Sequence, residues 1–582
     1  MFYPRLMKNR VSRRTVSAFY GYDHRLKNRE GSFYDTENLT NEDFPLLSTR
    51  RKRSLAAELE APQGMIEKDA LAYIDGGRLW YNGSATGISD LSPGEKQLVS
   101  MGAYIVIFPD KVYYNTADGS DFGSLEAEWS YSGRVEYSLC DSSGEEYPDV
   151  QYGGAAPEKP AEGNYWVNSD EGCLCRWSET EAMWIGIDTV YMKLSFTSEG
   201  QLPAQFSQYD GVEIEGARYP GLNGSKIIYA IGGTAADDSG GGESDWIVLM
   251  NEPSPGCTDE NVNITIKRKV PDMDYVCECR NRLWGCFYGN DGRKNLNELY
   301  ASALGDFKNW NQFMGLSTDS WRASVGSDGV WTGAAGYLGS PIFFKENRLH
   351  RISVSPGGGH QVSETPCRGV QKGSGRSLAV VNETLFYKSR DGVCAYQGGF
   401  PQTVSAALGG EQYSSAAAGA FGGKYYISMK NRRDEWNLFV YDAEKGLWMR
   451  EDDLKADCFV PLDDELYCLS GKKLIALRGT EGEKEGELRW RAETGMLCCE
   501  YPGQKYLSRL KIRARMEPDA EMELSIEYDS GGSWDYAGRV RLKKAGSVEI
   551  PLRLRRCDHL RLRLEGRGEM KLLSVTGELT AC

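Results

Sequence analysis

The sequence predicts an all-β protein, built as a β-propeller with an inserted small β-barrel domain and a C-terminal β-sandwich. Three observations support this prediction. Aromatic residues make up 11% of the 582 residues, and 67 Gly stand against 21 Pro, a composition that favours many short strands joined by tight turns. A unit of two apolar-aromatic strands around a Gly, Asn or Asp turn recurs from Leu71. The C-terminal region alternates strictly between apolar and charged residues.

The propeller is predicted from the spacing of this recurring unit. Phe343, Phe386, Tyr426 and Tyr467 occupy matching places in successive copies and are separated by 43, 40 and 41 residues. A period of about 40–45 residues with four short strands is typical of propeller blades. A long array of β-sandwiches is the alternative architecture.

The period breaks between Thr116 and Asn263, where short alternating strands follow their own spacing. This break predicts a small barrel inserted in a blade loop, with exposed flexible loops at 152–163 and 232–244. The expected organisation has five parts: a basic N-terminal arm (1–55), a first part of the propeller (56–118), the inserted barrel (119–260), a second part of the propeller (261–480) and the sandwich (481–582).

The charge distribution limits the partners. The net charge of -15 argues against a body that grips phosphate backbones. Residues 1–53 are nevertheless basic and end in the run Arg50–Arg53. That run is either a nuclear-localisation or nucleic-acid segment or, as we favour, a solvated arm that docks on an acidic neighbour. No apolar stretch approaches the roughly 20 residues that span a bilayer, and we expect the protein to be made in a reducing cytosol.

One strand of the predicted sandwich presents a cationic face. Leu510, Ile512 and Ala514 alternate there with Arg509, Lys511, Arg513 and Arg515, whereas acidic residues alternate with apolar ones over 521–528. Two interpretations are equally favoured. The basic and acidic strands pair their outer charges across one ladder, or the cationic face contacts the acidic surface of a partner.

The sequence predicts no catalytic, cofactor-binding or metal-binding residue. The 15 Cys include no C-x-x-C pair, and the four His include none at ligand spacing. Each C-x-C pair is interpreted as two buried thiols on one strand face. FGGKYY (421–426) lacks the Ser or Thr of a phosphate loop and is interpreted as a hairpin turn. His360 follows a glycine run without a nucleophile motif, and YDSGGSWDY (528–536) is interpreted as a structural turn.

The segment GSFYDTENLTNEDFPLLSTRRKR (31–53) resembles the packaged-DNA stabilisation or tail-hub (nozzle) proteins of tailed phages. The resemblance is specific over this stretch and architectural elsewhere. It implies a non-enzymatic virion protein of the tail, made in the bacterial cytoplasm, that forms a homo-oligomeric ring, often sixfold. The implied partners are other copies of the chain, a portal or head-tail adaptor ring, other tail proteins, and genomic double-stranded DNA that passes through the lumen without tight binding.

The same resemblance implies a set of assembly residues and a mode of action. Such rings retain the genome and conduct it outward. We hypothesise that loops of the inserted domain, such as 152–163 or 232–244, or loops of the blades narrow the lumen. The expected assembly residues are Tyr34, Asp35, Glu37, Asn38, Leu39, Phe44, Pro45, Leu46, Leu47, Arg50, Arg51, Arg53, Arg509, Lys511 and Arg513.

Two alternative functions belong to other classes. A receptor-binding or glycan-binding tail protein would use exposed aromatic loops. A propeller glycoside hydrolase would need two carboxylates a few ångströms apart, which a sequence with 83 Asp and Glu does not single out.

Overall fold

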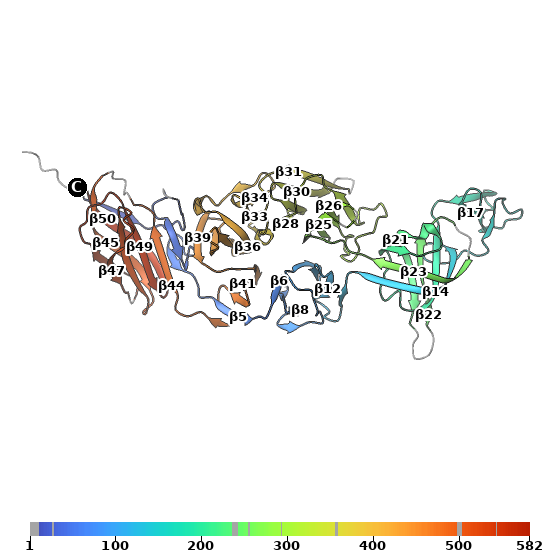
Figure 1. Cartoon of the computed structure of the whole chain (residues 1–582), viewed down its shortest axis with the longest axis horizontal. Coiled ribbons are helices and arrows are strands. Elements are labelled where there is room, and N and C mark those ends of the chain that lie inside the picture. Colours follow the sequence, from blue (N-terminus) through green and yellow to red (C-terminus); the bar gives the residue numbers. More distant parts are fainter. Residues whose placement is uncertain are drawn as a thin grey trace, which may run out of the picture. The chain divides into compact units, whose positions relative to one another are not determined.

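The computed structural model describes residues 11–25, 28–235, 242–253, 257–290, 292, 294–354, 359–497, 503–542 and 544–581. These residues form strands and three 3₁₀ turns, η1 (Pro220–Leu222), η2 (Gly375–Ser377) and η3 (Ala406–Leu408), with no α-helix among them (Figure 1). The predicted all-β class is therefore confirmed. Within the described ranges, no helix is long and apolar enough to span a membrane.

The chain divides into two compact units. The first contains Met1–Lys96, Gly329–Ile352 and Val362–Cys582, and the second contains Gln97–Asp328 and Ser353–Gln361.

Five sheets of the first unit are antiparallel meanders. The first sheet contains β6 (Pro62–Lys68), β7 (Ala70–Asp75), β8 (Arg78–Tyr81) and β9 (Ser84–Ala85), and the second contains β28 (Gly333–Tyr337), β29 (Ser340–Lys345), β30 (Arg348–Val354) and β31 (His360–Pro366). The third contains β32 (Ala379–Val381), β33 (Thr384–Ser389), β34 (Gly392–Tyr396) and β35 (Gln402–Thr403), and the fourth contains β36 (Tyr413–Phe421), β37 (Lys424–Asn431), β38 (Trp436–Asp442) and β39 (Leu447–Asp452). The fifth contains β40 (Cys458–Leu462), β41 (Glu465–Ser470) and β42 (Lys473–Ala476), together with β5 (Ser54–Glu58) and β43 (Glu483–Lys484).

The four aromatic residues of the sequence period occupy equivalent places in these sheets. Phe343, Phe386, Tyr426 and Tyr467 each lie on the second strand of their meander and are buried. Hydrophobic clusters join each of these four sheets to the next, and the sheet of β40–β42 to that of β6–β9. The period therefore marks sheets that pack face to face.

The N-terminal segment completes the last of these meanders. β5 pairs with β42 in the register Lys473↔Glu58 to Ala476↔Ser54. The earlier strands of the same segment enter two further sheets, as described next. The segment expected to form a basic arm thus contributes the strands β1 to β5, from Val11 on, to the sheets of the first unit.

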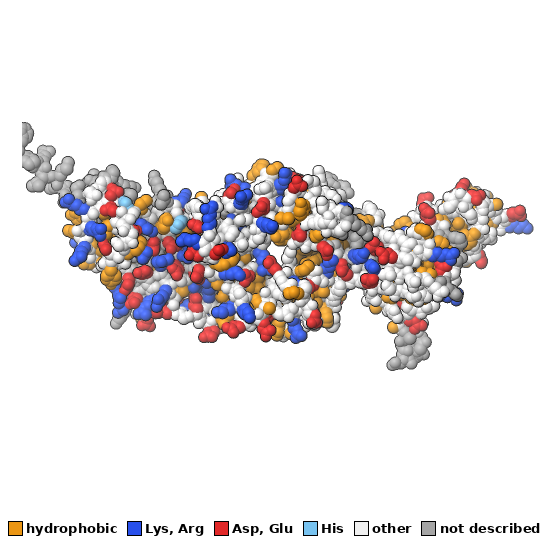
Figure 2. All heavy atoms as spheres, in the orientation of Figure 1, with side chains coloured by type: hydrophobic (Ala, Val, Ile, Leu, Met, Phe, Trp, Pro, Cys, Tyr) orange, Lys and Arg blue, Asp and Glu red, His pale blue; other side chains and the backbone are white. Residues whose placement is uncertain are grey.

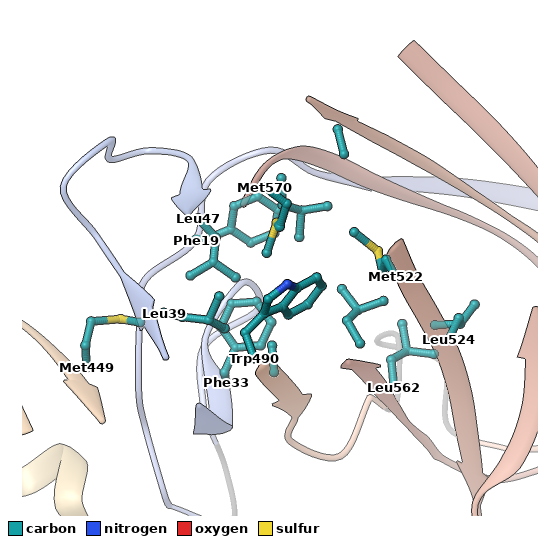
Figure 3. Packing of buried hydrophobic residues seen from close by; sticks show 14 of the residues in the cluster. Phe19, Phe33, Leu39, Leu47, Met449, Trp490, Met522, Leu524, Leu562 and Met570 are labelled. Carbon is teal, nitrogen blue, oxygen red and sulfur yellow. The ribbon is translucent and has the colours of Figure 1, made fainter. Parts of the chain in front are cut away.

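Two more sheets of the first unit share one core. One contains β3 (Leu39–Thr40), β4 (Leu47–Thr49), β50 (Met570–Ala581), β45 (Lys505–Met516) and β48 (Gly546–Pro551), with β1 (Val11–Val16) on β50; the other contains β2 (Phe33–Glu37), β44 (Arg489–Thr494), β49 (Leu560–Arg567), β46 (Glu521–Tyr528) and β47 (Asp535–Val540). Trp490 lies among the buried side chains of this core (Figure 3).

Of the two interpretations of the cationic face, the pairing of the basic and acidic strands is wrong. β45 and β46 belong to different sheets. The turn 517–520 carries the chain from one sheet to the other, so the apolar faces of both strands meet in the shared core. The acidic face of β46 instead pairs with arginines of its own sheet, for example Glu523 with Arg539 and Glu527 with Arg561.

The second unit contains a closed barrel of six strands in the order β14-β19-β22-β21-β20-β23, which confirms the predicted barrel. The bounds are β14 (Ala127–Cys140), β19 (Tyr191–Glu199), β20 (Gly211–Glu215), β21 (Gly224–Thr234), β22 (Glu243–Met250) and β23 (Cys257–Arg268). The last strand extends past the expected boundary at residue 260. Of the predicted loop 232–244, residues 236–241 lie outside the described residues.

Three further sheets complete this unit. Their strands are β10 (Gln97–Met101), β11 (Tyr104–Phe108), β12 (Val112–Asn115) and β13 (Phe122–Ser124); β24 (Tyr275–Glu278), β25 (Leu283–Asn290), β26 (Asn295–Ala301) and β27 (Trp321–Ser324); and β15 (Gln151–Gly153), β16 (Tyr165–Asn168), β17 (Cys173–Ser178) and β18 (Met183–Ile187). The first two share a hydrophobic core. The barrel strands lie between these two sheets in the sequence, as expected for an insertion.

Candidate functional site

The segment that carries the family resemblance is built into the first unit. Leu39 and Leu47 are 0% and 1% exposed and lie in the core around Trp490 (Figure 3). Of the other apolar residues expected to assemble the ring, Phe44 and Leu46 are half-buried and Pro45 is exposed. Leu39 and Leu47 therefore stabilise the subunit itself.

The polar residues of the segment also bond within the chain. Asp35 accepts a hydrogen bond from Arg491 at 3.0 Å and lies 3.4 Å from the Arg450 guanidinium. Asn38 donates to the backbone oxygen of Arg489 at 2.7 Å. Tyr34 and Glu37 are half-buried, and Glu37 lies 3.2 Å from Arg491. These contacts join β2 to its neighbours β39 and β44.

The run Arg50–Arg53 is not a fully solvated arm, which corrects the favoured interpretation. Arg50 and Arg53 are only 7% and 6% exposed. Arg53 donates to Glu451 at 2.8 Å and to Asp452 at 2.5 Å. The acidic neighbour is therefore the last strand, β39, of the same chain, because a desolvated guanidinium requires carboxylates close by.

Arg50 belongs to the same network. Its guanidinium donates to Asn38 at 2.7 Å and to Glu485 at 2.5 Å, and Glu485 also accepts the backbone N–H of Arg53. Arg51 points outward, with 58% of its side chain exposed. Of the three predicted assembly arginines in this run, Arg51 is the one available to a partner.

The carboxylates of this network predict an acid-sensitive stability. Burial tends to raise the pKa of Asp452, but Arg53 and Arg50 hold that pKa below its usual value, and Arg50 does the same for Glu485. Carboxylates with a lowered folded-state pKa stabilise the fold above the unfolded pKa of about 4, and this contribution is lost as the pH falls below it.

We therefore expect the free energy of unfolding to decrease as the pH falls from 5 to 3. Urea unfolding measured across that range tests the expectation, with Asp452→Asn as the comparison. The variant should be less stable at pH 7 and show a shallower pH dependence. An identical pH dependence in the two proteins would show that Asp452 does not contribute.

The cationic face of β45 is exposed, as the alternation predicts. Arg509, Lys511, Arg513 and Arg515 point to solvent in one row. Arg509 pairs with Glu549 at 2.5 Å and with Glu578 at 3.4 Å. Lys511, Arg513 and Arg515 have no ion pair with any described residue. The structure thus brings three of the predicted assembly residues, Arg509, Lys511 and Arg513, together on an outer sheet face. This face is separate from the buried network of Arg50 and Arg53.

Elsewhere on the surface the charges are mixed. On the face shown in Figure 2, acidic and basic side chains are interspersed. Many exposed cations have carboxylate partners, such as Arg541 with Glu521 and Arg555 with Asp535. The unpaired row on β45 therefore differs from these paired surface cations.

The motifs considered for catalysis have structural places. Gly422 and Gly423 form the two-residue turn between β36 and β37 with φ values of 55° and 74°, the backbone of a hairpin turn that glycine adopts without strain. His360 packs against both Trp284 and Trp321. Burial lowers the pKa of His350 to about 4 although Glu364 lies 3.3 Å away.

In the described part of the chain, no group of three or more His, Cys, Asp or Glu side chains has an arrangement that could hold a metal ion. Cys277 and Cys279 are buried, whereas Cys173 is half-buried with its Sγ 3.7 Å from that of Cys175. Cys498 and Cys499 lie outside the described residues.

Sequence reasoning missed two groupings. Ser530, in the turn after β46, lies 2.8 Å from His559 Nε2, and His559 Nδ1 lies 3.3 Å from Asp558. These side chains lie on an exposed turn that Asp529 also braces through backbone N–H groups. Lys424, passed over as part of a hairpin, is buried beside a cavity. The position of Lys424 after a Gly-Gly turn was the one feature of the sequence that could have drawn attention to it. Its burial could not be predicted, because burial depends on neighbours that are distant in the sequence.

Comparisons with known proteins show weak similarity. The sequence matches no family model and no curated protein. Among solved structures, a glycoside hydrolase covers 51% of this chain and 96% of its own at 11% identity and a TM-score of 0.20. A GH43 glycoside hydrolase engineered for endo-xylanase and exo-arabinofuranosidase activity covers 54% and 97% at 9% identity and a TM-score of 0.19. Scores this low establish neither a common fold nor a common activity.

Proposed function

We propose that the protein is a structural subunit of a phage tail, which assembles into a homo-oligomeric ring that retains packaged DNA and conducts it during ejection. The observation that carries the proposal is the exposed row Lys511, Arg513 and Arg515, which has no ion pair with the described residues, on an otherwise acidic chain. The resemblance of residues 31–53 to tail-hub proteins supplies the class of assembly.

The chemistry of the row restricts how two copies of the chain can meet. Like charges repel, so the row cannot face a copy of itself across a two-fold axis. It instead fits an acidic surface elsewhere on a second copy. Such a contact can occur twice across a two-fold axis, or once between successive copies, and the second, heterologous arrangement closes into a ring when the rotation permits. The resemblance of residues 31–53 is the reason for proposing the ring.

The acidic body suits a conduit. Every phosphate that a protein neutralises adds affinity for DNA and slows its passage. A chain with a net charge of -15, whose buried Arg50 and Arg53 are held by its own carboxylates, offers few such contacts. We assign the row on β45 to the neighbouring subunit and place the DNA against other surfaces.

We further propose that the meander sheets are the blades of a propeller. In the described residues, five of them lie in the first unit. β5, from the start of the chain, completes the sheet of β40–β42, as a strand that closes a circular array would. A propeller is a rigid block with few open sheet edges, which suits a ring subunit. Class averages of the purified protein test both the blade arrangement and the ring.

Charge reversal of the row tests the assembly. The variant Lys511→Glu, Arg513→Glu, Arg515→Glu should shift the protein from ring to monomer in light scattering coupled to gel filtration, because the attraction becomes repulsion. The wild-type ring should also weaken at high salt, which screens exposed charges.

A second variant controls for the change in net charge. Lys472→Glu, Lys473→Glu, Lys484→Glu alters three exposed lysines by the same amount and should leave the ring intact. Equal dissociation of both variants, or a monomeric wild type, would contradict the proposed interface. The glycan-binding and hydrolase functions stay predictions.

A further inference from the structure

A cavity of about 270 Å³ lies beside the tip of the β36–β37 hairpin in the first unit. Three cationic side chains and one carboxylate line it: Lys424 at the start of β37, Lys445 in the turn between β38 and β39, Arg478 after β42, and Glu42 in the loop between β3 and β4. Glu42 and Gly422 are exposed at its rim, so the cavity can be reached from solvent.

Lys424 is the unusual member of this group. Its side chain belongs to a residue that is only 8% exposed, and its Nζ has no hydrogen-bond partner among the described residues. An ammonium group carries three donors, and burying it without acceptors is costly. Burial lowers the pKa of Lys424, whereas the nearby carboxylates of Glu42, Asp442 and Glu451 act in the opposite direction.

The other two cations are held in place by their own contacts. Lys445 donates to Asp442 at 2.7 Å. The Arg478 guanidinium lies 3.6 Å from Glu42 and 5.1 Å from the centre of the Phe421 ring. The three cations come from three separate segments that line the one cavity. Such donors can each reach a different oxygen of one ligand, and charge-assisted hydrogen bonds of this kind are strong.

We propose that this cavity binds a small tetrahedral oxyanion of the phosphate type, with Lys424 donating to it from the buried wall. A tetrahedral anion has enough oxygens for all three cations, whereas a planar carboxylate has two. The bound anion would supply the acceptor that Lys424 lacks. It would also tie the sheet of β36–β39 to the segment after β42.

Glu42 opposes this binding. It lies on the cavity wall, 3.6 Å from Arg478 and 3.8 Å from Arg51, and its charge repels an incoming anion. We therefore expect two charge removals to change the affinity for the anion in opposite directions. Removing the charge of Lys424 weakens binding, and removing the charge of Glu42 strengthens it.

Calorimetric titration of the full chain with inorganic phosphate, at ionic strength held constant with chloride, tests the site. The wild type should show saturable binding and a melting temperature that rises with phosphate. Lys424→Met should lose about tenfold or more in affinity, as expected for one charge-assisted hydrogen bond. Glu42→Gln should bind more tightly, and Lys472→Met, at an exposed turn, should behave as the wild type.

Melting in phosphate-free buffer separates loss of binding from loss of folding. Lys424→Met should melt at or above the wild-type temperature there, because methionine fills the same space without an unpaired charge. Adenosine monophosphate distinguishes two sources of the same chemistry. Tighter binding than inorganic phosphate indicates a nucleotide phosphate, and weaker binding indicates the free anion.

Two results would overturn the proposal. The wild type could show no saturable response to phosphate, in which case the cavity holds water alone. Lys424→Met could respond as the wild type does, in which case phosphate binds elsewhere. Neither result bears on the ring, because Lys424→Met should retain the wild-type oligomeric state in gel filtration.

Discussion

Replacing Arg53 with methionine is expected to lower the free energy of unfolding by about 3–5 kcal/mol. The guanidinium is buried and bonded to Glu451 and Asp452 on β39. Without it, two carboxylates with restricted access to water lose their main compensating charge. Urea unfolding at pH 7 measures the change.

The matched control is Arg51→Met, two residues earlier in the same basic run. The Arg51 side chain is largely exposed and lies 3.8 Å from Glu42, and exposed ion pairs contribute only about 0–1 kcal/mol. Adding Asp452→Asn to Arg53→Met should recover part of the lost stability, because it removes one of the stranded charges. Equal effects of Arg51→Met and Arg53→Met would show that the network does not stabilise the fold.

Trp490→Ala is expected to destabilise the first unit by about 3–5 kcal/mol, the usual cost of truncating a buried aromatic side chain. Trp490 is 2% exposed and lies in the core shared by the two C-terminal sheets (Figure 3). Gly566 permits the close approach of its ring, since a Cβ at that position would lie 2.6 Å from the indole. Chemical denaturation measures the loss.

Trp490→Phe separates packing from hydrogen bonding. The indole N–H of Trp490 has no partner in the described part of the chain, so phenylalanine should cost much less than alanine. Trp448 provides the contrast, because its N–H donates to Val404 at 2.9 Å. Trp448→Phe removes that bond and leaves a partly buried carbonyl without its donor, at a cost of about 1–3 kcal/mol. If Trp490→Phe lowered the free energy of unfolding as much as Trp490→Ala does, the conclusion that the indole N–H makes no hydrogen bond to any described residue would be wrong.

The buried positions of these core and network residues change what the family resemblance indicates about assembly. Leu39, Leu47, Arg50 and Arg53 belong to the segment that resembles tail-hub proteins, yet their contacts are within the subunit. This segment joins two sheets and the end of β39, so its residue types are explained by the folding of the subunit. Assembly is better sought in exposed residues such as Arg51 and the row on β45.

The sequence by itself determined the all-β class, the inserted barrel and the exposed cationic row. These features depend on local periodicity: alternation places Lys511 and Arg513 on one face and Ile512 on the other wherever the strand lies, and the 40-residue spacing places Phe386 and Tyr426 on equivalent strands. Turn residues such as Gly422 and Gly423 act locally in the same way.

Only the tertiary structure decided which charges are buried and which strands are neighbours. β45 and β46 are consecutive in sequence but lie in different sheets, and β5 pairs with a strand more than 400 residues away. Arg53 meets its carboxylates, and Lys424 meets Glu42 and Arg478, through such distant contacts. The free energy of a buried charge depends on every group around it. Periodicity along the chain does not indicate which groups those are, because they come from distant parts of the sequence.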